Sequence, residues 1–231
     1  MRRYVSLSGG ADSTACAILW HEAGYEFELV FADTGAELPE TYWMIPRIAA
    51  ALGKKLHVVC GGTFYQQLVN FRFMLPSFQR RWCTRILKAA PLDKFYNADD
   101  VVAVGLRADE PQRVERYQAI LKPYQQEFPL HDVGMGRYGV MQLCEGYGLL
   151  NPAYKWRTNV SCFCCPFQRK RDWRNLRDHH PDLFALAEEW EQKSGTFGFN
   201  EKWTLTQLRE ADENQLSLLP ECSEEACLIC R

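Results

Sequence analysis

A serine- and glycine-rich segment near the start of the chain has the residue types of a phosphate-binding loop. Ser8–Thr14 reads SGGADST and separates an apolar run at residues 4–7 from a helical pattern at residues 13–23. Glycines let the backbone approach an anion, and the N–H groups and dipole at a helix start favour negative charge. The segment lacks the Gly-Lys-Ser/Thr ending of a Walker loop, and an ordinary strand–turn–helix is the alternative. The residues expected to serve a phosphate or sulfate group are Ser8, Gly9, Gly10, Asp12, Ser13 and Thr14, with Asp12 orienting the loop.

A second polar motif, Asp33-Thr34-Gly35, follows the apolar run at residues 27–31. A carboxylate at a strand end suits a ribose hydroxyl or a metal-bound water as its partner. We therefore expect Asp33, Thr34 and Gly35 to contribute to a nucleotide site.

A third motif, Gly105-Leu106-Arg107, follows residues 101–104. The guanidinium of Arg107 can contact a phosphate through two parallel hydrogen bonds. A surface ion pair with Asp109 or Glu110 is the alternative. Gly105 and Arg107 join the predicted nucleotide contacts, and Arg107 is also a catalytic candidate.

The ten cysteines are a further source of chemistry. In a reducing compartment, clustered cysteines indicate metal or redox chemistry more often than disulfides. Cys16, Cys60 and Cys144 lie in apolar surroundings, so we interpret them as small packed hydrophobes. The clustered cysteines are Cys83, Cys162, Cys164, Cys165, Cys222, Cys227 and Cys230.

The first half of the chain alternates between strand and helix patterns. This alternation predicts an α/β fold, a doubly wound parallel sheet with helices on both faces. Ligands bind at the carboxyl ends of the strands in such sheets, where all three polar motifs fall. The expected strands are residues 4–7, 27–31, 56–59 and 101–104, and the expected helices are residues 13–23, 40–52 and 92–97.

The second half is organised differently. Residues 113–137 are polar and carry prolines, so we interpret them as a mobile loop or substrate lid, or as a surface excursion. A helix is expected at residues 138–147, and an amphipathic helix pair at residues 172–193, broken at Pro181. We expect residues 1–150 to form the nucleotide-binding part, and residues 151–231 to form a helical, cysteine-rich segment of the same domain. The basic stretch Arg169–Arg177 suits either a solvated helix face or a contact with nucleic acid.

Composition narrows the function classes. The net charge of the 231 residues is −2, so no global attraction to nucleic acid or anionic membranes is expected. No apolar stretch reaches the roughly 18 residues of a membrane span. No leader pattern precedes the first expected strand, so we expect a cytoplasmic protein without a membrane partner.

The motifs occur in the order found in the phosphoadenosine phosphosulfate (PAPS) reductase family of PP-loop proteins, which the chain resembles over nearly its whole length. Ser8–Ser13 matches the phosphate loop of that family. Asp33–Gly35 with Pro39–Thr41 matches its second motif, and Gly105–Arg107 matches its third. Asn151-Pro152, shortly before a Cys-x-x-Cys, matches its late segment. The resemblance implies an adenine nucleotide as ligand: PAPS, adenylyl sulfate (APS) or ATP, the last with Mg²⁺.

The cysteine segments resemble the iron–sulfur branch of this family, the adenylyl-sulfate reductases. Arg81–Leu92 resembles the segment that carries a cysteine pair there, and Cys162–Pro166 resembles the Cys-x-x-Cys that completes the cluster. Trp82 stands in place of the first cysteine of the pair. The ligand set implied for a [4Fe–4S] cluster is Cys83, Cys162 and Cys165, with Cys230 as the predicted fourth ligand.

Other arrangements of these cysteines remain open. The fourth ligand is otherwise Cys164, Cys222 or Cys227, or one iron stays open for a sulfur or substrate atom. Two Cys-x-x-Cys pairs, at residues 162–165 and 227–230, also have the spacing of a structural zinc site. A chain without any metal is the third possibility.

The resemblance also implies a catalytic cysteine near the C-terminal end. Reductases of this family carry Glu-Cys-Gly-x-His there, and Glu221-Cys222 matches its start. The Gly and His are missing, and acidic neighbours raise a thiol pKa rather than lower it. Cys222 is the predicted nucleophile, with a metal ligand or a tail thiol as alternatives.

Three functions follow from these observations. The first is reduction of adenylylated sulfate, PAPS or APS, to sulfite, with a thioredoxin-like thiol donor as partner. The second is an ATP-pyrophosphatase-type sulfurtransferase that acts in nucleic-acid thiolation or DNA modification. The third is a non-catalytic sensor of a nucleotide or cluster. The oligomeric state is left open.

Overall fold

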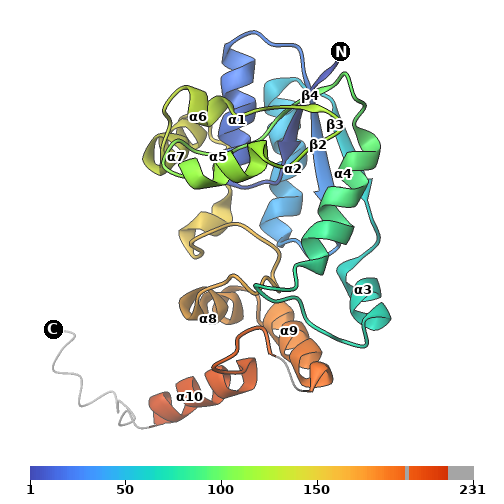
Figure 1. Ribbon diagram of the computed structural model, residues 1–231. Helices are drawn as coiled ribbons and strands as arrows, with labels where there is room; N and C mark the ends of the chain where they lie inside the picture. The colour runs from blue at the N-terminus through green and yellow to red at the C-terminus, as the bar shows by residue number, and fades with distance from the viewer. Residues whose placement is uncertain (196–197, 218–231) are drawn as a thin grey trace, which may run out of the picture.

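The computed structural model describes residues 1–195 and 198–217, and its centre is a parallel sheet (Figure 1). The strand order is β3-β2-β1-β4-β5, and every neighbouring pair is parallel. Strands β2 and β3 are added on one side of β1, and β4 and β5 on its other side. Ligands of doubly wound sheets bind at this switch point, between β1 and β4. The strands are β1 Arg3–Leu7, β2 Glu28–Asp33, β3 Leu56–Cys60, β4 Val101–Ala103 and β5 Gln125–Glu127.

Helices connect the strands and cover both faces of the sheet. The first half contains α1 Ala11–Glu22, α2 Pro39–Leu52, α3 Phe64–Asn70, the π-helix η1 Thr84–Ala89 and α4 Ala90–Phe95. The middle contains α5 Pro111–Gln118, α6 Pro129–Asp132, α7 Arg137–Gly146 and the short 3₁₀ helix η2 Pro152–Lys155. The last elements are α8 Lys170–His179, α9 Pro181–Ser194 and α10 Leu205–Ser217.

Alternation along the strands explains the two faces. Successive side chains of a strand point to opposite sides, so Val5 and Tyr4 enter different cores. Val5 and Leu29 pack with α1, α2 and α7. Tyr4 and Val30 pack with Tyr96 and with partly buried side chains of α4. Helices α1 and α7 accordingly lie on one side of the sheet and α4 on the other (Figure 1).

A second core joins the late helices to the loops beyond the sheet. Trp173 of α8 and Trp190 of α9 are buried together with Leu38, Phe64 and Trp82. Figure 1 shows α8, α9 and α10 grouped at one end of the sheet. Since this core contains side chains from both halves of the chain, the late helices stabilise the loops after β2 and β3.

The predicted sheet with helices on both faces is confirmed, and so is the helix pair broken at Pro181. The interpretation of residues 113–137 as a loop is wrong, because this segment contains most of α5, the edge strand β5 and α6. Strand β5 has polar residues at a sheet edge, where no apolar run is required. Pro129 occupies a helix start, a position that proline favours.

Two of the three cysteines interpreted as packed hydrophobes are confirmed. Cys16 and Cys144 are fully buried in the first core. The interpretation of Cys60 is wrong: it is exposed at the end of edge strand β3, and its thiol donates to the Gly62 carbonyl at 3.5 Å. Among the described helices, none combines the length and apolar composition needed to cross a bilayer.

Candidate functional site

The loop between β1 and α1 has a backbone that requires glycine. Gly9 has φ +75°, in the left-handed region, and a Cβ atom there would lie 2.8 Å from Cγ2 of Thr41. Gly10 is the extended N-cap residue of α1. Within the described residues, no hydrogen bond engages the backbone N–H groups of Gly9, Gly10 or Asp12. This loop therefore presents unengaged donors at a helix start, as an anion site requires.

The hydroxyl groups of the loop brace it from within. Ser8 Oγ and Ser13 Oγ are 3.0 Å apart, and the Ser8 N–H donates to Ser13 Oγ at 3.0 Å. Thr14 is buried, and its hydroxyl and N–H both donate to the Gly10 carbonyl. Thr14 is thus oriented into the helix rather than toward a ligand, while the exposed Ser8 hydroxyl borders the loop surface.

Two side chains from the late half of the chain hold this loop, and we refer to Asn151 and Tyr154 as the clamp. Asn151 Nδ2 donates to the Gly9 carbonyl at 3.0 Å. The Tyr154 hydroxyl accepts from the Ala11 N–H at 2.9 Å. The motif at Asn151 is therefore in direct contact with the loop. Tyr154 was missed, because nothing in the spacing of a lone tyrosine indicates a partner so far away.

Arg107 ties the third motif to the loop. Its guanidinium donates to Asp12 at 2.9 Å and to Asp109 at 2.8 Å, and it lies 3.5 Å from Glu110. The predicted alternative of an ion pair with Asp109 and Glu110 is present, and Asp12 is a third partner. The two phosphate-directed hydrogen bonds predicted for Arg107 remain untested, since these carboxylates engage the guanidinium here.

Close packing brings Arg107 and Asp12 together. A Cβ atom on Gly105 would lie 2.7 Å from the backbone C and O of Asp12, so only glycine fits. Burial raises the pKa of Asp12, and Arg107 partly offsets this effect. The Asp12 side chain thus contacts another protein side chain, and its role in orienting the loop stays a prediction.

The second motif lies at the end of β2. The Asp33 Oδ1 atom accepts from the Gly35 N–H at 2.8 Å and from the Tyr42 hydroxyl at 2.7 Å. Gly35 has φ +68°, the left-handed region again. Thr34 is buried and its hydroxyl donates to Glu37 at 2.9 Å. Asp33 is therefore held at the carboxyl end of β2, and the Thr34 side chain points away from it toward the cysteines.

The cysteine segment docks against this second motif. Cys162 Sγ lies 3.6 Å from Thr34 Oγ1 and donates to Glu37 Oε1 at 3.3 Å. Lys88 Nζ pairs with the same Glu37 oxygen at 3.2 Å. Lys88 belongs to η1, the π-helix that starts directly after Cys83, and π-helical turns are frequent at functional sites. The predicted nucleotide motif and one predicted ligand cysteine are thus adjacent.

Two cations flank the cysteines. Burial disfavours the charged form of Lys88, but its electrostatic interactions with Cys162 and Glu37 outweigh burial and raise the Lys88 pKa. Burial lowers the pKa of Arg157, while Cys165 acts in the opposite direction. Arg157 donates to the Ser161 carbonyl at 3.2 Å, and its Nε is buried without a partner among the described residues. Sequence reasoning missed Glu37 and Arg157, which have no motif of their own.

These residues fit a thiolate-bound metal group in their chemistry. Cys165 influences the pKa of both Cys83 and Cys162, so the three sulfurs share one neighbourhood, and soft thiolates suit iron–sulfur clusters or zinc. The unpartnered Arg157 Nε is a donor suited to an anionic cluster. Within residues 1–195 and 198–217, however, no three Cys, His, Asp or Glu side chains are already placed as a metal site. The ligand set therefore stays a prediction.

The remaining cysteine predictions divide by location. Cys164 is fully buried in the second core, and burial raises its thiol pKa well above the ordinary value. Trp82 is buried and donates to the Met74 carbonyl at 3.2 Å, as a core residue does. The other candidates, Cys222, Cys227 and Cys230, lie outside the described residues.

The basic stretch Arg169–Arg177 is largely engaged by the protein itself. Arg174 donates to Asp212 of α10 at 2.6 Å, and Arg177 donates to the same carboxylate at 2.9 Å. Arg171 donates to the Thr158 hydroxyl at 3.3 Å. These contacts favour an intramolecular role for the stretch.

Comparisons with known proteins found a matching family model and similar sequences. The family model described as phosphoadenosine phosphosulfate reductase domain matches residues 2–132. Two uncharacterized proteins of Methanocaldococcus jannaschii, MJ0066 and MJ0973, are 28% and 24% identical over 198 and 205 residues. These matches cover 81% and 85% of this chain but only 40% and 48% of the relatives, so the chain spans less than half of their length.

Two solved structures are also similar. A phosphoadenylyl-sulfate reductase from Candida auris, in a phosphate complex, has a TM-score of 0.52 at 14% identity, covering 70% of this chain and 81% of that one. This likeness concerns the fold. A predicted subunit of a tRNA methyltransferase from Methanocaldococcus jannaschii has a TM-score of 0.41 at 23% identity, covering 63% of this chain and 76% of that one.

Proposed function

The chain belongs to the phosphoadenosine phosphosulfate reductase family, and from this we propose that it binds an adenine nucleotide on the Ser8–Ser13 loop and uses it for sulfur chemistry at cysteine thiols. One observation carries the proposal. Cys162 lies 3.6 Å from Thr34, so the cysteine segment borders the motif that follows β2. A nucleotide held at the carboxyl ends of β1 and β2 would therefore reach the cysteines.

The substrate that we propose first is an adenylylated sulfate, PAPS or APS. The Cys222 thiolate attacks the sulfate sulfur, the bond from sulfur to the bridging phosphate oxygen breaks, and the nucleotide leaves as 3′-phospho-AMP or AMP. The enzyme then carries an S-sulfocysteine. A thioredoxin-like dithiol supplies two electrons and two protons, which yields bisulfite, the free Cys222 thiol and the donor's disulfide.

The described residues have distinct parts in this scheme. The N–H groups of Gly9, Gly10 and Asp12 bind the phosphosulfate, and the Asp33 carboxylate accepts from a ribose hydroxyl. Arg107 acts as a positioning residue that holds Asp12 and the loop. A [4Fe–4S] cluster or zinc ion would be held by Cys83, Cys162 and Cys165, with Cys230 as the fourth ligand. The cluster would supply an electron-transfer centre beside the nucleotide, and zinc a structural one.

A second candidate is ATP-dependent sulfur transfer to a nucleic acid, with Mg²⁺ on the nucleotide. It is favoured by one specific observation: an arginine-lined cavity includes Trp82 and Thr84, the two neighbours of Cys83. In this scheme the same loop holds ATP, which is cleaved between its α- and β-phosphates to adenylate the acceptor. The outer sulfur of a cysteine persulfide, loaded by an external sulfur donor, attacks the adenylated atom, and AMP leaves. A dithiol then reduces the disulfide between cysteine and acceptor, which leaves the sulfur on the acceptor and frees the cysteine thiol.

One assay separates these candidates. Protein purified without oxygen is incubated with a dithiol and either PAPS, APS or ATP, and sulfite and pyrophosphate are measured. Sulfite from PAPS or APS that is lost in Cys222→Ser supports the reductase, and pyrophosphate from ATP supports the sulfurtransferase. Binding without any product would overturn both and indicate a sensor.

Asp12→Ala should abolish nucleotide binding but leave metal content unchanged, and unchanged affinity would contradict the loop assignment.

A further inference from the structure

A basic cavity of about 610 Å³ lies outside the nucleotide loop. Three arginines line it together with aromatic and thioether side chains, and none of the described lining residues is acidic. Because the chain as a whole carries a net charge of −2, this positive charge is local rather than general. The residues that matter here are Arg80, Arg81, Arg85, Phe71, Met74 and Trp82.

An exposed aromatic pair borders this cavity. The rings of Phe78 and Phe167 are 4.4 Å apart and meet edge to face, although 62% and 45% of these residues are exposed. The Arg81 guanidinium lies over the Phe167 ring, 5.1 Å from its centre. Neither phenylalanine belongs to the described cores, and the ring surface that Arg81 and the partner ring leave uncovered is exposed.

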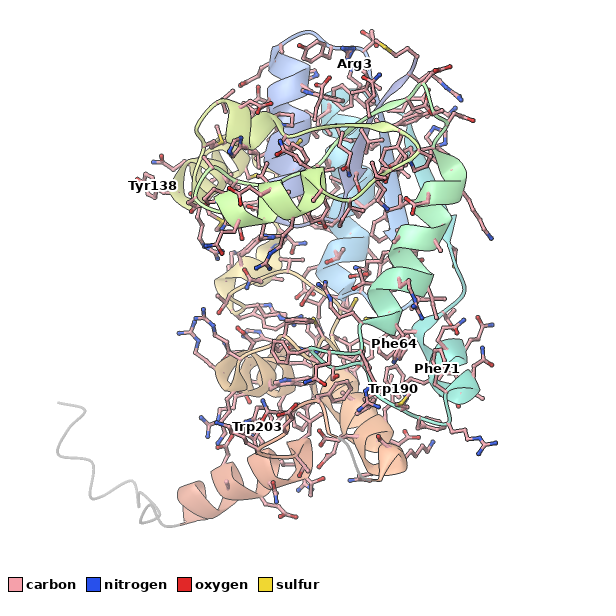
Figure 2. The ribbon with its side chains drawn as sticks, viewed as in Figure 1. Arg3, Phe64, Phe71, Tyr138, Trp190 and Trp203 are labelled. Atoms are coloured by element: carbon pink, nitrogen blue, oxygen red, sulfur yellow. The ribbon has the colours of Figure 1, made fainter. Side chains whose placement is uncertain are left out.

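A second cavity of about 590 Å³ lies next to the first. The two share Gln79 and Arg80, and the second adds Lys202 and Trp203 with one acidic residue, Glu201. Figure 2 labels Trp203 of the second cavity and Phe71 of the first on opposite sides of the lower half of the molecule. Basic and aromatic groups therefore line both hollows.

A turn with unusual backbone angles forms one wall of the first cavity. Arg72 and Phe73 have φ of 51° and 59°, a region that residues other than glycine rarely adopt. Their neighbours Phe71 and Met74 line the cavity. Such conformations cost about 1–3 kcal/mol each and concentrate at ligand sites.

We propose that these adjoining cavities bind single-stranded nucleic acid, with unpaired bases stacked on Phe78 and Phe167 and phosphates on Arg80, Arg81 and Arg85. A positive track with accessible rings is the arrangement by which proteins hold single strands, because every base has a face to stack. Paired bases have no free face, so a duplex is excluded from this mode.

The proposed strand-binding track, formed by Phe78, Phe167, Arg80, Arg81 and Arg85, lies close to the cysteines in the sequence. Thr84 and Trp82 line the first cavity on either side of Cys83, and Phe167 is two residues beyond Cys165. A base on the track would lie beside the cysteine neighbourhood. The proposed binding site thus specifies the acceptor of the second candidate function as a single strand. Its biological purpose rests on that proposed function, whereas strand binding itself does not.

The test is fluorescence anisotropy of labelled 12-nucleotide single strands with the full chain, without any adenine nucleotide. Phe167→Ala should weaken binding about tenfold. Arg85→Ala should reduce the slope of the logarithm of affinity against the logarithm of salt concentration by about 1. A matched control is Arg47→Ala, since Arg47 is exposed and stacks on the exposed Trp43 ring of α2 at 4.2 Å. It should leave affinity unchanged.

Several outcomes would overturn the proposal. These are an equal loss in Arg47→Ala, tighter binding of a duplex, or equal binding of a poly-glutamate peptide that is lost in the same track variants. The proposed function is tested separately, because sulfite and pyrophosphate are measured without oligonucleotide. Track variants that lose strand binding should retain affinity for ATP or APS at the Ser8–Ser13 loop, and loss of both would contradict a separate site.

Discussion

The phosphate loop and the cysteine neighbourhood are positioned by different physical means. The loop depends on backbone geometry: Gly9 and Gly105 allow contacts that a Cβ atom would block. The cysteine neighbourhood depends on charge: Glu37 lies between Lys88 and Cys162, and Arg157 is buried nearby. A site of the first kind is sensitive to one added methyl group, whereas a site of the second kind is sensitive to the loss of one charge.

The largest effect is expected for Gly105→Ala. Its Cβ atom would lie 2.7–2.8 Å from backbone atoms of Asp12 and Ser13, which cannot move without shifting the start of α1. We expect a loss of about 3 kcal/mol in the free energy of unfolding and at least a tenfold loss of nucleotide affinity, measured by urea unfolding and calorimetry. In the control Gly146→Ala, no atom of the described residues lies within 4 Å of the new Cβ apart from the adjacent residues and the backbone of the same helix. An equal effect there would contradict the backbone argument.

The next effect concerns charge, in Glu37→Gln. The change removes the carboxylate shared by Lys88, Thr34 and Cys162. Since hydrogen bonds to charged groups contribute about 1.5–3 kcal/mol, and Lys88 is partly solvated, we expect a loss of about 1.5 kcal/mol in urea unfolding. Glu189→Gln is the control, because Glu189 pairs with exposed Lys193 on the surface of α9. A change as small as the control's would mean that charge does not hold the cysteine segment.

The clamp provides a smaller test, Tyr154→Phe. It removes the hydroxyl that accepts from the Ala11 N–H, so we expect a loss of about 1 kcal/mol. Hydrogen exchange at the Ala11 amide should become faster by about fivefold. Tyr138→Phe removes an exposed hydroxyl that accepts a hydrogen bond from Gln142, and it should change neither quantity. Unchanged exchange in Tyr154→Phe would show that the clamp does not stabilise the loop.

The smallest effect is expected for Asp212→Asn and depends on pH. Hydrogen bonds from Arg174 and Arg177 hold the pKa of Asp212 below its usual range, despite partial burial. A lowered folded-state pKa stabilises the protein above the unfolded value of about 3.9 and is lost as pH falls through the folded value. At pH 7 the variant should be less stable by about 0.5–1 kcal/mol. The difference between the two proteins should shrink as pH falls through the lowered pKa of Asp212, and a difference that stays constant would contradict an ionic origin.

The same contrast explains what the sequence could predict. Strand ends and glycines are local signals, so the parallel sheet and the three motifs at its carboxyl edge were predictable. Glu37 and Arg157 act only through residues far along the chain, and neither belongs to a periodic pattern. Strand β5 was missed for a related reason. Its polar residues have no strand pattern of their own, and it forms a strand because it pairs with β4.

The clamp also has a consequence for synthesis of the protein. Asn151 and Tyr154 contact residues that precede them by 142 and 143 positions. At about 5–20 residues per second, Tyr154 is made roughly 7–30 s after Ala11. Contacts of such wide sequence separation form late in folding. A nascent chain will therefore carry the whole phosphate-loop sequence for many seconds before that loop has acquired the shape of a nucleotide site.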